Sequence, residues 1–166
     1  MRNIISVLLL SILFSSCGNE KGESSGVEVN PEADSLAQEV KNETLRSWKS
    51  YKKYAWGHDV LAPISKSYKD CYKEPLYISP IDAFSTLHLM ELKDEASEIE
   101  RYVVDSLNFD KDIDVKIFEV NIRILGGLLA MYEHSQNPRV LDKARDFADR
   151  MLLAFDTKTG IPKYWV

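Results

Sequence analysis

Residues 115–134 constrain the fold most strongly, because their apolar side chains point in nearly every direction around a helical axis. The apolar set is Ile117, Phe118, Val120, Ile122, Ile124, Leu125, Leu128, Leu129 and Met131. A helix that is apolar all round is normally buried on all sides. The paired Gly126 and Gly127 lower helix stability, which predicts close approach of a neighbouring backbone at this point. We therefore expect an inner helix of a larger helical assembly.

The rest of the domain, residues 34–166, follows the same helical pattern. Helices are predicted at residues 34–57, 81–92, 95–107, 115–134 and 138–155. Asp34 or Ser35 can cap the first helix, and Pro138 opens the last, whose polar side indicates an outer helix. No strand-like alternation of useful length appears, so the predicted fold is all-α. Apolar inner helices followed by amphipathic outer ones are typical of helical hairpins, in closed barrels and open solenoids alike.

The N-terminus has the features of a bacterial export signal. Arg2 supplies positive charge, residues 4–14 are largely apolar, and small residues precede Cys17. This order resembles a lipobox, in which the cysteine is lipidated, so residues 1–17 are predicted to be a lipoprotein signal peptide. An ordinary secretory signal that contains a cysteine is the alternative. Polar residues 18–33 suit a flexible tether, and together they predict a membrane-anchored lipoprotein of the cell envelope, periplasmic or surface-exposed.

Composition excludes several classes of function. The formal charge of -5 over 166 residues argues against nucleic acid as a partner, which needs a basic face. With Cys17 lipidated, Cys71 is left alone, and a single cysteine of this kind is more often a packed thiol than a nucleophile. The histidines, His58, His88 and His134, are thirty or more residues apart and form no HExxH pair. The sequence therefore gives no support for zinc.

Two charges, Glu119 and Arg123, interrupt the apolar helix of residues 115–134. They are one turn apart and so share a face. Burying a charge is costly unless it is paired. Spacing alone leaves two interpretations open. The pair can be a structural ion pair that braces the helix, or a general acid beside a cation that anchors substrate.

Four ordered blocks resemble glycoside hydrolase family 47, the class I α-1,2-mannosidases. The blocks are residues 51–59 (YKKYAWGHD) with 63–65 (PIS), 82–87 (DAFSTL), 109–129 (FDKDIDVKIFEVNIRILGGLL), and 154–157 (AFDT) with 160–162 (GIP). The resemblance extends from about Trp48 to Val166 in the family's order. It implies a calcium-dependent hydrolase of the (α/α)7 barrel class, acting as a monomer, that removes terminal α-1,2-linked mannose from glycans with inversion.

The resemblance also implies roles for single residues. Glu119 matches the carboxylic acid that protonates the leaving oxygen, and Arg123 matches an arginine that contacts substrate. The family's catalytic base and its calcium-binding threonine lie beyond Val166, so no metal ligand is expected in this segment. Seven hairpins need at least about 240 residues, whereas residues 34–166 number 133. We therefore expect an incomplete barrel domain that is inactive in isolation.

The chain departs from the family at several positions. Ser85 stands where Asp is usual, Val60 where Glu is usual, and Glu91 where Gly is common. His58 and Asp59 match the family and are expected to be a packed histidine and a helix cap. The Ser85 departure and the missing carboxylates motivate an alternative, a non-catalytic mannosidase-like lipoprotein that binds glycan or protein. An unrelated α-solenoid interaction module ranks last, because its concave face would be polar.

Overall fold

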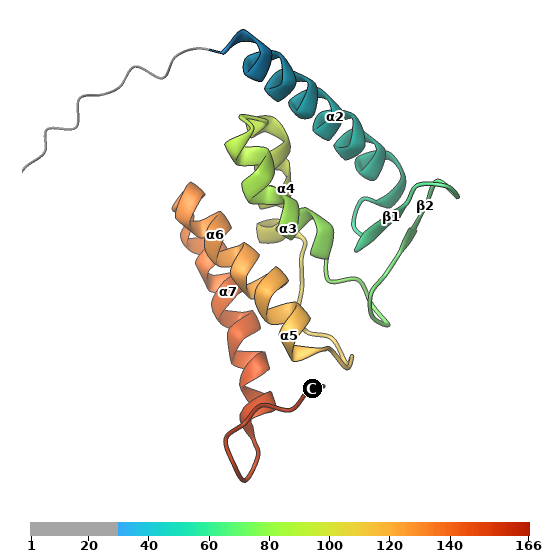
Figure 1. The fold of residues 1–166 in the computed structure, drawn as a ribbon. Coiled ribbons are helices and arrows are strands. Elements are labelled where there is room, and N and C mark those ends of the chain that lie inside the picture. Colours follow the sequence, from blue (N-terminus) through green and yellow to red (C-terminus); the bar gives the residue numbers. More distant parts are fainter. Residues whose placement is uncertain (1–29) are drawn as a thin grey trace, which may run out of the picture. The chain divides into compact units, whose positions relative to one another are not determined.

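The computed structural model describes residues 30–166 (Figure 1). Its α-helices are α2 (Pro31–Ala55), α3 (Ile78–Leu89), α4 (Lys93–Asp105), α5 (Ile117–Val120), α6 (Gly126–Ser135) and α7 (Pro138–Met151). A π-helical turn, η2 (Asn121–Leu125), joins α5 to α6, and a 3-10 turn, η3 (Leu152–Phe155), follows α7. The predicted signal peptide, the lipidation site at Cys17 and most of the tether fall within residues 1–29, outside the described residues. Among residues 30–166, no helix is long and apolar enough to cross a membrane.

The first helix begins earlier than the sequence indicates. Asn30 precedes α2, and its side-chain oxygen accepts the backbone N–H of Glu32 at 3.1 Å, while Pro31 occupies the first helical position. A prolyl residue is well suited to that position because its missing N–H would be unpaired there anyway. Asp34, predicted as the cap, therefore lies inside the helix. Residues 38–166 form one packing unit, and the contacts described below lie within it.

Two helical hairpins stack side by side. Helices α3 and α4 form the first, and α6 and α7 form the second (Figure 1). Helix α3 contacts α6, and α4 contacts α7, so equivalent helices of the two hairpins abut. The predicted stacking of helical hairpins is thus present. The described residues depart from an all-α fold in a short antiparallel hairpin of β1 (Val60–Ala62) and β2 (Ser67–Lys69) and in an isolated bridge between Lys116 and Trp165. The three-residue strands of the hairpin are too short to produce a detectable alternation.

The helix that runs through α5, η2 and α6 is buried on one side only. Val120, Ile124, Leu128 and Met131 form a stripe of fully buried side chains, against which α3 and α7 pack. On the other side, exposed fractions reach 65% for Phe118, 51% for Ile122 and 46% for Leu129. The expectation of burial on all sides is therefore wrong for this face. The reason is that the described helices supply neighbours for one side of this helix and leave the other apolar side facing outward.

The two adjacent glycines make a matched pair of test positions. A Cβ at Gly127 would lie 2.5 Å from Cγ2 and 3.1 Å from the carbonyl oxygen of Ile81, whereas at Gly126 it would meet only the Asn121 carbonyl oxygen at 3.7 Å. Close approach of a neighbouring backbone, predicted for both glycines, is thus confirmed at Gly127 alone.

Alanine at these two positions is expected to change stability in opposite directions. Gly126→Ala should stabilise the helix by up to about 1 kcal/mol, because alanine is the better helix former. Gly127→Ala should destabilise the protein by about 1–2 kcal/mol, since the cost of overpacking against Ile81 exceeds that gain. Urea unfolding of both variants measures the difference, and equal stabilisation by both would contradict the close approach of α3 and α6.

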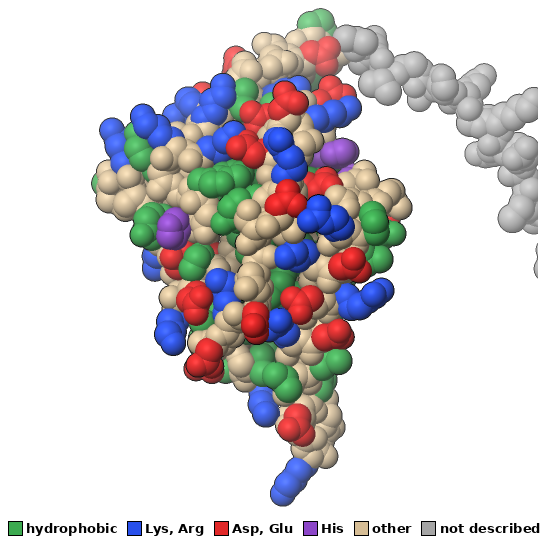
Figure 2. Space-filling model, turned by 180° about the vertical axis from the view of Figure 1, so that it is seen from behind, with side chains coloured by type: hydrophobic (Ala, Val, Ile, Leu, Met, Phe, Trp, Pro, Cys, Tyr) green, Lys and Arg blue, Asp and Glu red, His purple; other side chains and the backbone are tan. Residues whose placement is uncertain are grey.

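The surface carries charges of both signs. Figure 2 shows basic and acidic side chains interspersed over the face that it presents, with apolar groups between them. Ion pairs on the described surface include Arg139–Asp105 at 2.9 Å and Arg150–Asp110 at 3.1 Å. The face shown in Figure 2 is therefore not a continuous basic one of the kind that binds phosphate backbones.

Candidate active site

The helical segment that carries Glu119 and Arg123 is interrupted between them. Glu119 lies in α5, and Arg123 lies in the π-helical turn η2. Single π-helical turns within α-helices occur frequently at functional sites. Here the Nη1 atom of Arg123 lies 4.0 Å from the Oε2 atom of Glu119. The two side chains share a face, as predicted, but form no close ion pair.

The close partner of Arg123 is Asp82 of α3, which sequence reasoning did not identify. The Nε atom of Arg123 donates to Oδ2 of Asp82 at 2.6 Å, and both side chains are about one-third exposed. Partial burial lowers the pKa of the Arg123 guanidinium, but the hydrogen bond and the charge of Asp82 outweigh it, so that its pKa is raised. Arg123 is thereby held as an oriented cation, and Glu119 keeps its carboxylate free of a short charge-assisted bond to it.

These side chains border an open hollow of about 360 Å³. Its walls include Glu119, Arg123, Cys71, Tyr72, Lys116 and Trp165. Partial burial, with a contribution from the charge of Asp59, raises the pKa of the Cys71 thiol. The thiol is thus less ionised at neutral pH than a free cysteine, but Cys71 as a residue is exposed, so the expectation of a packed thiol is wrong. A single carboxylate with a neighbouring guanidinium and aromatic walls suits the binding and protonation of a polar ring.

Asp59 fixes the loop that forms one wall of this hollow. Its side chain is fully buried, and its carboxylate accepts the backbone N–H groups of Cys71 at 2.9 Å, Leu76 at 2.8 Å and Ile78 at 3.1 Å. Ile78 is the first residue of α3, so the predicted role of Asp59 as a helix cap is confirmed. The carboxylate also binds two N–H groups of the loop before that helix, those of Cys71 and Leu76. The sequence did not indicate this second role.

His58 and Asp70 extend the same network. The His58 Nδ1 atom lies 3.0 Å from Oδ2 of Asp70, and the backbone N–H of Asp59 donates to Oδ1 of Asp70 at 3.0 Å. The His58 ring stacks on Tyr68 of β2. His58 is thus packed at the base of the hairpin, as predicted, and is not among the residues that line the hollow beside Glu119.

The described residues do not assemble a metal site. Within residues 30–166, no three His, Cys, Asp or Glu side chains lie close enough to hold a metal ion. His88 and His134, which are far apart in the sequence, do meet, with ring centroids 4.4 Å apart, but the rings are stacked. Stacked rings do not direct their nitrogens at a common point. The residues described here therefore do not fit the calcium ion that the resemblance implies.

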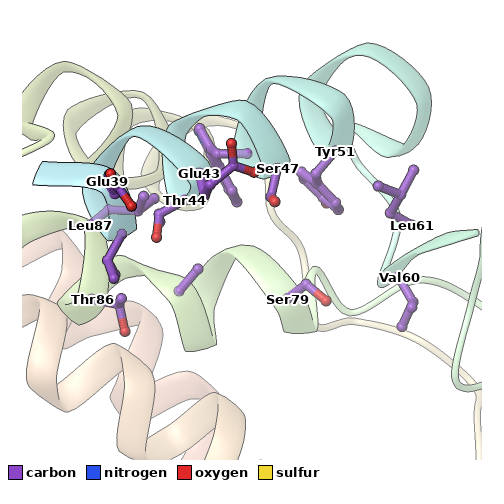
Figure 3. A pocket seen from close by; sticks show the side chains of 13 residues that line it. Glu39, Glu43, Thr44, Ser47, Tyr51, Val60, Leu61, Ser79, Thr86 and Leu87 are labelled. Atoms are coloured by element: carbon purple, nitrogen blue, oxygen red, sulfur yellow. The ribbon is translucent and has the colours of Figure 1, made fainter. Parts of the chain in front are cut away.

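A larger hollow lies elsewhere, between α2 and α3 (Figure 3). It measures about 770 Å³ and is lined mainly by apolar and hydroxyl side chains, Trp48, Tyr51 and Thr86 among them. Glu43, one of its two acids, bonds to Arg46 of the same helix at 2.7 Å, and that hydrogen bond lowers its pKa. Neither Glu119 nor Arg123 lines this larger hollow. The larger of these two hollows is therefore not the one that contains the candidate catalytic residues.

Comparison with known proteins identifies relatives of residues 43–166. The profile of Glycosyl hydrolase family 47 matches residues 43–166. A mannosyl-oligosaccharide 1,2-alpha-mannosidase of Arabidopsis thaliana is 43% identical over 125 residues, covering 75% of this chain and 22% of that protein. The endoplasmic reticulum mannosyl-oligosaccharide 1,2-alpha-mannosidase of Rattus norvegicus is 44% identical over 118 residues, covering 71% and 18%. The chain thus spans about a fifth of the length of these relatives.

A solved structure agrees with the sequence comparison. The alpha-1,2-mannosidase from Trichoderma reesei superposes with a TM-score of 0.73 and 31% sequence identity, covering 80% of this chain and 30% of that one. The family resemblance drawn from four sequence blocks is confirmed. So is the fold, because the stacked hairpins match part of an α/α barrel.

Proposed function

This chain belongs to glycosyl hydrolase family 47, and we propose that it supplies the acid half of an active site that removes terminal α-1,2-linked mannose from glycans. The observation that carries the proposal is the position of Glu119. It borders an open hollow beside Arg123, while Asp82 holds the guanidinium at 2.6 Å. Glu119 is the general acid, and Arg123 contacts the sugar.

The proposed chemistry is a single displacement with inversion at the sugar. Glu119 protonates the oxygen of the leaving sugar while water attacks the opposite face. Such a reaction needs a second carboxylate roughly 6.5–9.5 Å away to activate the water. Among residues that line the hollow, Glu119 is the one carboxylate. The base and any calcium ligands are therefore assigned to parts of the native protein outside residues 30–166.

Mannose release by the native protein tests this proposal. An antibody against residues 34–60 isolates that protein from its cells, and its mass shows how much chain accompanies the domain. We expect it to release mannose from an α-1,2-mannobioside, to do so poorly from an α-1,6-mannobioside, and to lose activity when calcium is chelated. The 166-residue chain alone is expected to release none, because one carboxylate cannot both protonate the leaving group and activate water. Release by the chain alone would contradict the half-site assignment.

A binding function without catalysis is the second candidate. The observation that favours it is Ser85, which lies on α3 one turn after Asp82, where the family usually has an acid. Nothing in the described residues explains this substitution. If the native protein binds an α-1,2-mannoside but releases no mannose from it, this candidate replaces the enzyme.

The proposed location is the bacterial cell envelope, through a lipid on Cys17. The support is the sequence of residues 1–18, with its apolar stretch and small residues before the cysteine. Cells that express the native protein should incorporate labelled palmitate into it, and Cys17→Ala should abolish the label. Equal labelling of both proteins would contradict the anchor.

A further inference from the structure

Trp165 stands at the rim of the same hollow as Glu119, although the two residues are far apart in sequence. Three backbone hydrogen bonds pair the chain end with the segment before α5, from Val115 N to Val166 O at 2.7 Å, from Val166 N to Val115 O at 3.1 Å, and from Ile117 N to Tyr164 O at 3.1 Å. The pairing places Trp165 opposite Lys116 as an antiparallel bridge. Because α5 begins at Ile117, this short ladder fixes Trp165 beside the helix that carries Glu119.

The aromatic residues of this ladder face different hollows. Trp165 lines the hollow of Glu119 and Arg123, whereas its neighbour Tyr164 lines a separate one with Phe118. The two rings nevertheless meet edge to face, with their centroids 5.9 Å apart. The Lys116 ammonium lies 5.4 Å from the centroid of the Trp165 ring, within the range of a cation–π contact. The backbone bridge to Lys116 and the contact with the Lys116 ammonium thus hold the indole in place.

Exposure distinguishes Trp165 from a tryptophan of the core. Trp48 is 6% exposed and belongs to the buried cluster, whereas Trp165 is 45% exposed. Its indole therefore offers apolar area to the hollow that the carboxylate of Glu119 and the guanidinium of Arg123 also line. Asp82, which does not line the hollow, pairs with Arg123 at 2.6 Å, and the other charged side chains of the lining are Lys116 and Glu119, one of each sign. A hollow of this kind suits an uncharged ligand that has one apolar face and a polar edge.

We propose that Trp165 is a sugar-binding residue of this site, whose indole covers the C–H face of a mannopyranose while the hydroxyl edge of the ring meets Arg123 and Glu119. The inference rests on the proposed function, because it takes mannose as the ligand. It adds a residue that the family resemblance does not assign. Tyr72, on the loop held by Asp59, lines the same hollow and limits how the ring can turn.

Nuclear magnetic resonance of the isotopically labelled 166-residue chain, titrated with α-1,2-mannobiose, tests the inference. The indole N–H signal of Trp165 should shift saturably together with the Nε–H signal of Arg123, while that of buried Trp48 stays in place. Trp165→Ala should weaken binding about tenfold, the loss expected for one aromatic contact. Trp165→Phe should retain most of the affinity. The matched control, Phe155→Ala, changes an exposed aromatic residue that lines the separate hollow and should alter binding less than about twofold.

Each outcome bears on a different claim. If mannobiose shifts the Arg123 signal but not that of Trp165, or if Trp165→Ala binds as well as Phe155→Ala, the sugar-binding role of Trp165 is wrong and the proposed function stands. If no signal shifts, the inference is likewise overturned, and mannose release by the native protein then decides the proposed function separately.

Discussion

Glu119→Gln is expected to lower the rate of mannose release by the native protein by about a hundredfold to ten-thousandfold, the usual contribution of general acid catalysis. Glutamine has nearly the shape of glutamic acid but no proton to give to the leaving oxygen. The substitution should therefore lower kcat and change KM little, because the contacts of Arg123 with substrate remain. Steady-state kinetics with an α-1,2-mannobioside measures both constants.

The leaving group provides the internal control for this experiment. A mannosyl donor whose leaving group needs no proton, such as α-mannosyl fluoride, should lose far less rate in Glu119→Gln than the mannobioside loses. Glu133→Gln is the matched control variant, since Glu133 is an exposed carboxylate on α6 of the same helical segment. An equal loss of rate with both substrates would show that Glu119 acts in some way other than protonation of the leaving group.

Asp59→Ala is expected to destabilise the protein by about 4 kcal/mol, because each unpaired buried donor costs roughly 1–3 kcal/mol. The substitution leaves the backbone N–H groups of Cys71, Leu76 and Ile78 without the carboxylate that accepts them. A loss of this size is a large part of the 5–15 kcal/mol by which a typical domain is stable. Urea unfolding, followed by circular dichroism, measures it.

A milder variant keeps this prediction informative if Asp59→Ala does not fold. Asp59→Asn retains the Oδ1 atom that accepts the N–H groups of Leu76 and Ile78 and loses only the acceptor for Cys71, where an amide N–H replaces it. It should therefore lower the free energy of unfolding less than Asp59→Ala does. Cys71 then reports on the loop, and its thiol should be alkylated faster than in the unaltered protein. Asp114→Ala, at an exposed position, is the control and should change stability by less than about 0.5 kcal/mol. A similarly small effect of Asp59→Ala would refute the role of this carboxylate.

The sequence predicted the helices well because their apolar spacing is a local property. The buried stripe of Val120, Ile124, Leu128 and Met131 has the period of a helix packed on one side. The exposure of Ile122 agrees with the expectation that an incomplete barrel leaves the apolar wall around Ile122 and Leu125 uncovered. The exposure of Phe118 was not predicted, because an apolar side chain does not specify which part of a protein covers it. The starts of α2 and α3 were predicted three residues late, whereas the start of α7 at Pro138 was predicted correctly. For α2 the reason is that the cap, Asn30, lies one turn ahead of the apolar pattern.

The candidate site was predictable only in part. Glu119 and Arg123 were found because they are one turn apart in an apolar helix. Asp82 was missed because it lies 41 residues from Arg123 along the chain and meets it only through the packing of α3 against η2. The signal that the sequence offered was Gly127. Its missing side chain allows α6 to approach Ile81 of α3, the residue next to Asp82. Trp165 was missed for a similar reason, because backbone pairing rather than periodicity places it.

The anomeric form of the mannose first released by the native protein tests the central claim most directly. Proton nuclear magnetic resonance, recorded during the first minutes of reaction with an α-1,2-mannobioside, distinguishes the two anomers before they equilibrate. A general acid at Glu119 and a water activated across the ring predict β-mannose as the first product. α-Mannose as the first product, or no mannose at all, would contradict the assignment of this chain to an inverting mannosidase.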